Sequence, residues 1–508
     1  MVQHETPAVS GVEQTAPAGT DNPTPASARS RWAISRGALL ALMAVLLPAA
    51  ASLLAAVLTA DIAYHLRSGA LMLETGAILD QDTFTFTALG EPWLNQQWAA
   101  SVLFAAVYDA TGWLGLLVLR AVIIGATFGL VYSACRGVEA SRLVASLVTL
   151  GAFLVAATNL ALRSQLFGAL FFAAVVAILV WRRRHPWLLV LIPLLMVAWA
   201  NTHGSFFMGW AAIGLAFLED VLARRRRLAA ATFAVGVLSV LATLVTPWGV
   251  EMWVYVVELS SDPVIAALVS EWQAPTLRSS TGIFFFASVA LVAGLLLYRG
   301  RVISWLQVLW LGGLILLSLM AARSVIWWAI GAAPVVATLL AGLEIRGRRV
   351  GDPAYDQPSG VGYTAIAGLL IVLTLAVVPF YRPSTPLYGP EGVVQHAPRG
   401  VTEALAAQAG PGDRLYAAQR WGSWLEFALP GVPVMVDTRI ELFDSDIWDD
   451  YLDVAAGRAD WAQILDRWEV TFVALEADSG DLIPFIEASA AWERLHQGDD
   501  GVVYRRVE

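Results

Sequence analysis

An acid, a tyrosine and a histidine stand together directly after the first long apolar run. Asp61 precedes Tyr64 by three residues and His65 by four, and residues 64–74 carry apolar side chains at helical spacing, which is typical of a helix lying in a membrane interface. An aspartate at the start of such a helix can cap its free N–H groups. It can equally act as a general base, or bind a metal ion, beside a substrate held at the lipid boundary.

Polar residues that could bind a phosphate or a sugar recur at the ends of other apolar runs. Two guanidinium groups, of Arg163 and Arg323, could clamp a phosphate, or each could extend to the lipid head groups. His203 stands where two apolar runs join with almost no loop and could be structural or functional. The residues predicted to bind substrate are Tyr64, His65, Asp82, Arg163, Gln165, Asn201, His203, Glu271, Arg323, Asp437 and Arg439.

Two further acids stand in segments expected outside the bilayer. Glu271 precedes Trp272, and a carboxylate beside an aromatic ring could belong to a sugar site, although a water-exposed loop acid is the simpler interpretation. Asp437 follows the apolar segment 432–436, at the carboxyl end of an expected strand, where open α/β sheets place ligand groups. Asp437 and Arg439 could instead pair with each other or cap a turn. If functional, this region would recognise the acceptor or cover the membrane site.

The elements that must position these residues are mostly membrane helices. Of the 508 residues 58% are hydrophobic and only 14% are charged, which excludes an ordinary water-soluble protein. Apolar runs recur between Gly37 and Phe380, and lipid forces such runs to be helical. The single cysteine, Cys135, excludes a disulfide framework and a cysteine-based metal site. No phosphate-cradling glycine loop, zinc-type spacing or nucleophile elbow is present.

Arginine clusters predict which ends of the runs face the cytoplasm. They keep the N-terminal tail, residues 1–36, inside; that tail has the composition of a disordered segment. The later arginine clusters all face the cytoplasm only if one apolar run does not cross the bilayer. The shortest run, 98–108, is therefore expected to be re-entrant or interfacial. This gives about 11 crossings of an inner cell membrane, with a large first outer loop, residues 61–97, and an external or periplasmic C-terminus.

The pattern changes near residue 399. Short apolar runs then alternate with helical segments, which predicts a small soluble α/β domain over residues 399–508. Residues 381–398 are expected to link it to the membrane domain, residues 37–380. The predicted fold class is therefore a polytopic α-helical membrane protein with a small C-terminal α/β domain on the outer face.

This arrangement resembles the GT-C membrane glycosyltransferases. The likeness rests on a span ending in Asp61, a long outer loop, the approach to the next helix at Trp98, and an external α/β domain after the bundle. More narrowly, residues 37–350 resemble the bacterial branch related to the dolichyl-phosphate-mannose–protein mannosyltransferases. The resemblance implies a polyprenyl-phosphate-linked sugar as donor at the outer leaflet.

The resemblance also implies that an acid in the first outer loop is the base, which falls on Asp61. That branch has two adjacent acids there, whereas Ile62 follows Asp61 in this chain. Either Asp82 or Glu271 supplies the second acid, or the chain has lost that chemistry.

The predicted function is transfer of a sugar from a polyprenyl-phosphate donor to a cell-envelope acceptor, without a nucleic-acid partner. Asp61 would be the base, Arg163 or Arg323 would help to hold the phosphate, and a divalent metal ion could take part. Two alternatives remain open. A flippase or transporter for lipid-linked sugars would need a polar path through the membrane. The predicted spans are mostly free of charged residues, and Arg120 is the clear exception. A non-catalytic scaffold would only bind a partner through its outer domain.

Overall fold

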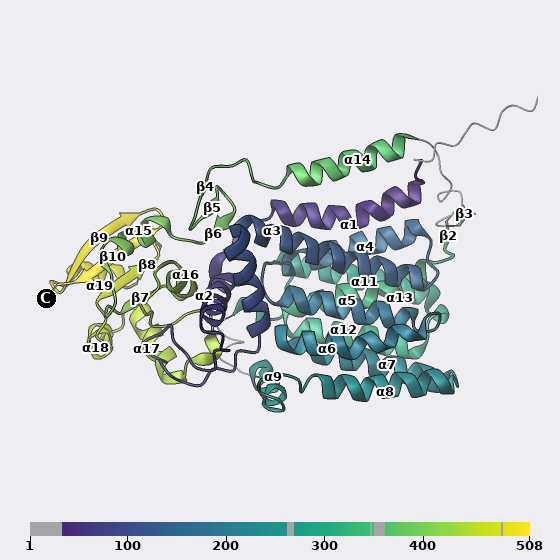
Figure 1. The fold of residues 1–508 in the computed structure, drawn as a ribbon, viewed down its shortest axis with the longest axis horizontal. Helices are drawn as coiled ribbons and strands as arrows, with labels where there is room; N and C mark the ends of the chain where they lie inside the picture. The colour runs from purple at the N-terminus through teal and green to yellow at the C-terminus, as the bar shows by residue number, and fades with distance from the viewer. Residues whose placement is uncertain (1–32, 262–268, 346–347, 350–360, 479–480, 508) are drawn as a thin grey trace, which may run out of the picture.

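The computed structural model describes residues 33–261, 269–345, 348–349, 361–478 and 481–507. Helices run side by side along the long axis, and a small sheet lies at one end of this bundle (Figure 1). The predicted disordered tail lies outside the described residues except for its last four. The helices of the bundle are α1 (Arg36–Leu54), α3 (Trp98–Gly137), α4 (Arg142–Ala156), α5 (Gln165–Trp181), α6 (Leu191–Thr202), α7 (Phe207–Leu222), α8 (Arg226–Ala242), α11 (Ser280–Arg299), α12 (Trp305–Met320), α13 (Val325–Leu340) and α14 (Val361–Ala376).

Six helices in the described part of the chain are long and apolar enough to cross a membrane. Several of the bundle helices begin at a serine: the Oγ of Ser35 accepts the N–H of Ala38, and Ser304 forms a capping box with Gln307, so free N–H groups at the helix starts are satisfied. Because six helices among the described residues are long and apolar enough to cross a membrane, the chain is a multi-pass membrane protein. The six spans are Arg36–Leu54, Trp98–Gly137, Arg142–Asn159, Gly204–Leu222, Ser280–Val302 and Ala322–Leu340, and shorter apolar helices cover Gln165–Trp181, Pro186–Thr202, Trp305–Met320 and Val361–Ala376.

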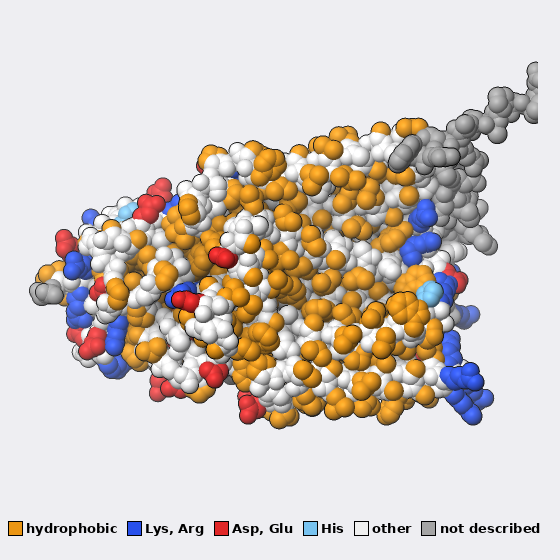
Figure 2. Space-filling model, viewed as in Figure 1, with side chains coloured by type: hydrophobic (Ala, Val, Ile, Leu, Met, Phe, Trp, Pro, Cys, Tyr) orange, Lys and Arg blue, Asp and Glu red, His pale blue; other side chains and the backbone are white. Residues whose placement is uncertain are grey.

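The two ends of the bundle differ in charge. Apolar side chains cover the bundle, and arginines gather at the end far from the sheet, over the α7–α8 turn (Figure 2). At that end Arg182 donates from Nε to buried Asp220 at 2.9 Å, and Thr232 donates to the same carboxylate at 3.1 Å. This ion pair joins α5, α7 and α8.

Helix α3 is broken at Gly112, whose φ of 62° and ψ of −156° are not helical. Glycine tolerates this conformation because it lacks a Cβ atom. The part before the break, from Trp98 to Thr111, is about 14 residues or roughly 20 Å long, too short to cross a hydrocarbon layer of roughly 30 Å. The segment expected to be interfacial, 98–108, therefore lies within a short helix that is separated by a kink from the long apolar part of α3.

The short first part of α3 packs against α2 (Thr59–Thr75), which lies across the end of the bundle (Figure 1). A Cβ atom at Gly69 of α2 would clash with the backbone carbonyl of Ser101 in α3, so glycine permits this close approach. The junction between α1 and α2 is held by buried Arg120, which donates to the carbonyls of Ser52, Ala55 and Ala56. This charge within a span is thus used to cap the end of α1.

The remaining short elements connect the bundle helices or lie at its ends. They are η1 (Ala157–Asn159), η2 (Pro186–Val190), η3 (Gly204–Phe206), α9 (Glu251–Ser261), η4 (Ser270–Trp272), η5 (Gly300–Val302), η6 (Ala322–Ser324), β2 (Glu344–Ile345) and β3 (Arg348–Arg349). Among them η3, α9, η4 and η6 lie near the sheet-bearing end.

The C-terminal sheet is mixed, with strand order β7-β8-β10-β9; β7 and β8 are parallel and the other neighbours are antiparallel. Its interior is formed by residues such as Val473, Tyr504 and Leu465. The elements are β7 (Leu415–Ala417), β8 (Phe472–Leu475), β9 (Trp492–Gly498), β10 (Gly501–Arg506), α15 (Arg399–Gln408), α16 (Gln419–Ala428), η8 (Ile440–Leu442), α17 (Ser445–Ala455), α18 (Trp461–Arg467) and α19 (Ile483–Ala488).

The segment predicted as a strand, 432–436, is not a regular strand. Only Val434 makes bridges, one to Leu415 and one to Thr85 of the first loop. The N–H of Phe86 donates to the carbonyl of Val434 at 3.1 Å, so loop backbone takes the place that a longer strand would fill.

The expected linker also pairs with other segments. Within it, β4 (Ser384–Thr385) pairs with β5 (Gly389–Pro390), and β6 (Val394–Gln395) lies parallel to β1 (Val57–Leu58). The first loop, the linker and the C-terminal elements therefore form one layer on the end of the bundle.

Candidate active site

A cavity of about 370 Å³ lies where this outer layer meets the bundle. It is lined from α2, the segment before α3, the start of α5, η3, α9, η4, the end of α12, η6 and the segment around η8. Polar residues on its wall include Tyr64, His65, Gln96, Gln97, Arg163, Ser164, Gln165, His203, Ser205, Ser260, Glu271, Arg323, Thr438, Arg439 and Glu441.

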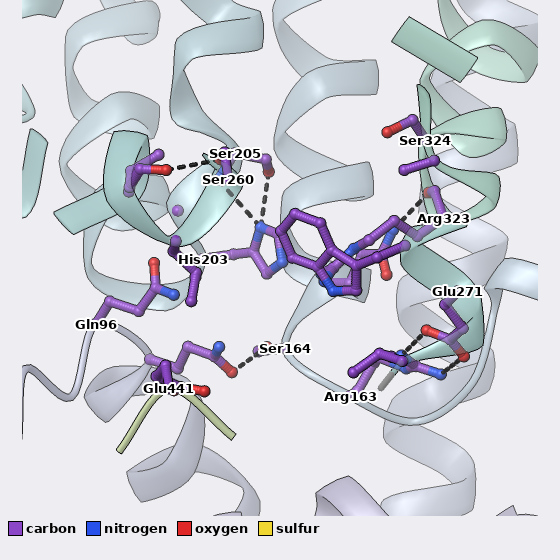
Figure 3. Close-up of a pocket in the computed structure, with 18 of the residues that line it drawn as sticks. Gln96, Arg163, Ser164, His203, Ser205, Ser260, Glu271, Arg323, Ser324 and Glu441 are labelled. Atoms are coloured by element: carbon purple, nitrogen blue, oxygen red, sulfur yellow. Dashed lines mark hydrogen bonds and ion pairs between the residues drawn. The ribbon is translucent and has the colours of Figure 1, made fainter. Parts of the chain in front are cut away.

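One side of the cavity carries two arginines. Arg163 and Glu271 form a bidentate pair, with Nη1 to Oε2 at 2.5 Å and Nη2 to Oε1 at 2.6 Å (Figure 3). Arg323 lies over the ring of Trp272, 4.6 Å from its centroid. Burial alone would raise the pKa of Glu271, but the hydrogen bonds and charge of Arg163, with the charge of Arg323, hold that pKa below its ordinary value. Glu271 is therefore ionised, and the described residues of this side comprise two positive charges and one negative charge.

His203 is held in one tautomer between the arginine side and η3. The N–H of Ser205 donates to its Nδ1 at 3.1 Å, and the Oγ of Ser205, which accepts from Trp199 Nε1, lies 2.8 Å from the same nitrogen. Burial, followed by the positive charges of Arg323 and Arg163, lowers the pKa of His203 to about 3. The ring is neutral with its proton on Nε2, so it offers one hydrogen-bond donor.

Helix α2 forms a further wall of the cavity. His65 Nδ1 lies 2.7 Å from Ser101 Oγ, and burial together with the charge of Arg163 lowers the pKa of His65 to about 3. The hydroxyl of Tyr64 donates to Gln97 Oε1 at 3.1 Å. Asp61 lies in the first turn of this helix, but its side chain lies outside the described part of the structure.

Eight of the eleven predicted substrate-binding residues line the cavity: Tyr64, His65, Arg163, Gln165, His203, Glu271, Arg323 and Arg439. Gln165 donates from Nε2 to the carbonyl of Arg323 at 3.0 Å, which holds the loop that carries this arginine. Asn201 does not line this cavity: its amide accepts from Trp98 Nε1 at 2.9 Å and donates to the carbonyls of Val197 and Val245. Its hydrogen bonds are thus used to join helices.

Three predicted residues form a buried ion cluster behind the cavity. Arg439 donates from Nε to Asp437 at 2.7 Å and from Nη2 to Asp82 at 2.7 Å. Arg439 also lines the cavity, but Asp82 and Asp437 do not, because both carboxylates turn to this guanidinium. The pairing of Asp437 with Arg439 agrees with the structural interpretation of these two residues.

Glu426 completes this cluster. It is buried, with Arg439 Nη2 3.9 Å from Oε1. Burial and the negative charges of Asp437 and Asp82 raise the pKa of Glu426 well above its ordinary value. The pKa of Arg439 is raised despite burial, because Asp437 and Asp82 favour its charged form.

Sequence reasoning missed the polar residues that come from other segments. Gln96 and Gln97, directly before Trp98, and Tyr255 of α9 were not selected, and Glu441 follows no pattern that marks it. A Cβ atom at Gly204 would clash with Gln96 Oε1, so the glycine after His203 makes room for this side chain. The position of Glu441, two residues after Arg439, was the one available signal.

Among the residues whose side chains are described, no group of three or more His, Cys, Asp or Glu could hold a metal ion. Glu271 turns to Arg163, and the two cavity histidines are held by serines. The described donors therefore fit an anion better than a divalent cation.

No protein-family model and no curated protein matches this sequence. Solved structures do match. The oligosaccharyltransferase of Archaeoglobus fulgidus is 13% identical with a TM-score of 0.55, over 93% of this chain and 74% of that one; AglB from the same organism has been solved with an inhibitory peptide and a dolichol-phosphate.

Two further solved structures share the arrangement. ArnT from Cupriavidus metallidurans, bound to undecaprenyl phosphate, is 13% identical with a TM-score of 0.54, over 93% of this chain and 98% of that one. The arabinofuranosyltransferase AftD from Mycobacteria is 16% identical with a TM-score of 0.55, over 93% of this chain but 40% of that one. The chain thus has the fold of the GT-C membrane glycosyltransferases.

Proposed function

We propose that this chain is an integral membrane glycosyltransferase that moves a sugar from a polyprenyl-phosphate donor to a cell-envelope acceptor. The observation that carries the proposal is the cavity at the end of the bundle, where Arg163, Arg323 and neutral His203 surround one space in a GT-C fold. Two guanidinium groups and an N–H donor match the oxygens of a phosphate.

The proposed base is Asp61. Tyr64 and His65 line the cavity, and Asp61 precedes them by one turn of the same helix, the spacing at which helical residues are neighbours. An acceptor hydroxyl oxygen attacks C1 of the sugar while the bond from C1 to the phosphate oxygen breaks. The bonding electrons stay on the phosphate, and the hydroxyl proton passes to the Asp61 carboxylate.

The arginines stabilise the leaving phosphate as its charge develops. Arg163 pairs with Glu271, so its guanidinium is positioned for the donor phosphate. Of the two acids considered as a second acid, Glu271 lines the cavity and Asp82 is paired with Arg439. The proposal therefore assigns Glu271 to positioning Arg163 and leaves proton transfer to Asp61.

The finer assignments are part of the same proposal. The chain crosses an inner membrane about eleven times, with the arginine-rich end of the bundle in the cytoplasm and the cavity on the outer side. The distribution of arginines over the bundle supports this orientation (Figure 2). Within the GT-C enzymes we place the chain nearest the bacterial relatives of the protein mannosyltransferases, on the sequence resemblance given above.

The proposal is tested with Asp61→Asn in the purified full-length protein, supplied with undecaprenyl-phosphate-linked sugars and envelope acceptors. Asparagine keeps the size and the capping ability of aspartate but cannot take the proton. Transfer should fall about 10²- to 10⁴-fold. Glu74→Gln, at an exposed position in the last turn of the same helix, is the matched control and should transfer at the parental rate.

Full activity of Asp61→Asn would show that Asp61 is only a helix cap. If the parent consumes no polyprenyl-phosphate-linked sugar, the enzyme assignment fails and the scaffold or flippase alternative takes its place.

A further inference from the structure

One acid on the cavity wall has no part in the mechanism above. Glu441 lies in η8 of the C-terminal layer and lines the same cavity as Arg163. Figure 3 shows Glu441 and Gln96 on the opposite side of the cavity from the pair formed by Arg163 and Glu271. The cavity therefore has a cationic side, contributed by the bundle, and an acidic side, contributed by the outer layer.

The segment that carries Glu441 is fixed on both sides. Arg439 is held by Asp437 and Asp82, and the indole N–H of Trp448 donates to the carbonyl of Ile440 at 3.2 Å. The hydroxyl of Thr438 donates to the carbonyl of Ala60 at 3.1 Å, the residue directly before the proposed base. The buried ion cluster thus positions Glu441 beside the start of α2.

Two further polar groups lie on or beside this side of the cavity: Gln96 lines it, and Tyr255, which does not line it, contacts Glu441. The hydroxyl of Tyr255 donates to Glu441 Oε1 at 3.2 Å. Gln96 is buried, and its Oε1 has no hydrogen-bond partner among the described residues, which is unfavourable unless a ligand supplies one. A carboxylate oxygen accepts more than one hydrogen bond, so Glu441 can also accept from the hydroxyl groups of a ligand.

We propose that Glu441, Tyr255 and Gln96 form the acceptor subsite, and that the acceptor is an uncharged carbohydrate that presents several hydroxyl groups. The proposal rests on the function proposed above. Sugar hydroxyls both donate and accept, which matches a carboxylate, a phenol and an amide. A phosphate or carboxylate on the acceptor would meet like charge at Glu441, and repulsion of this kind excludes wrong ligands.

The test measures the binding of two probes to the full-length protein in lipid nanodiscs. One probe is undecaprenyl phosphate, and the other is a panel of neutral methyl glycosides and disaccharides, each compared with its phosphorylated form. The parent should bind at least one neutral sugar and prefer it to the phosphorylated form. Glu441→Gln and Tyr255→Phe should each weaken that sugar about tenfold, the loss expected for one hydrogen bond to a charged group, and leave undecaprenyl phosphate binding unchanged.

Glu493→Gln, at an exposed position on β9, is the matched control and should bind both probes like the parent. The inference is overturned if the parent binds no neutral sugar, if it prefers the phosphorylated sugars, or if Glu441→Gln weakens both probes equally. The transfer assay described above separates these outcomes from failure of the proposed function: a parent that consumes a polyprenyl-phosphate-linked sugar but gives one of these binding results keeps the proposed function and loses only this inference.

Discussion

Two clusters of arginine and acid face the same cavity from opposite layers and differ in burial. The Arg439 side chain is 1% exposed, and Asp82 and Asp437 are fully buried around it. The Arg163 side chain is 18% exposed, and the side chain of Glu271, with which it pairs, is 40% exposed. A buried arginine between two carboxylates has its charge compensated and serves to hold segments together. An accessible arginine beside a partly exposed carboxylate and a second arginine can bind anions.

The largest expected effect is on stability, at the buried cluster. Arg439→Gln leaves Asp82 and Asp437 buried without their partner, which should cost about 3–5 kcal/mol of folding free energy. Thermal unfolding of the detergent-purified protein measures the loss. Arg505→Gln, at an exposed position on β10, is the control. Equal unfolding temperatures for the two variants would show that the cluster does not hold the layers together. The double variant Asp82→Asn/Arg439→Gln should lose less than the sum of the single losses.

The second effect is on anion binding, at the accessible pair. Arg163→Gln should weaken undecaprenyl phosphate binding roughly ten- to hundred-fold, because charge-assisted hydrogen bonds to the phosphate are lost. Glu271→Gln removes the competing negative charge, while its amide oxygen can still accept from Arg163 and keep it in position, so this affinity should stay unchanged or increase. Titration of both variants in nanodiscs with undecaprenyl phosphate measures whether each substitution lowers or raises the affinity. If both variants weaken binding equally, the pair serves only to hold the loop that carries Glu271.

The smallest effect is on the pH dependence of stability. His203 stays neutral in the native protein down to a pKa of about 3, whereas the unfolded chain protonates near its ordinary value of 6.5. The unfolded state binds more protons between these values, so stability falls as the pH decreases below about 6.5, by at most about 1.4 kcal/mol per pH unit for one group. Between about pH 7 and pH 5.5, the unfolding temperature of His203→Asn should fall less than that of the parent. His396→Asn, at an exposed position, is the control and should behave like the parent. If the unfolding temperature of His203→Asn falls with pH as much as that of the parent, His203 does not account for the acid sensitivity.

The sequence by itself determined the features that depend on local pattern. Apolar runs of membrane length predict helices because lipid cannot pair with a free backbone, and polar residues at their ends mark where chemistry meets the interface. On this basis Arg163, His203, Glu271 and Arg323 were selected although they lie far apart in the chain, and the structure places all four on one cavity.

Tertiary structure alone decided which acids are accessible to a ligand. Asp82 and Arg439 are separated by 357 positions in the chain, and no periodicity in either segment shows that they meet. Their pairing removes Asp82 from the cavity and fixes the segment that brings Glu441 into it. The reason is physical: a buried charge requires a partner, but which distant segment supplies that partner depends on how the loop, linker and C-terminal elements pack on the end of the bundle.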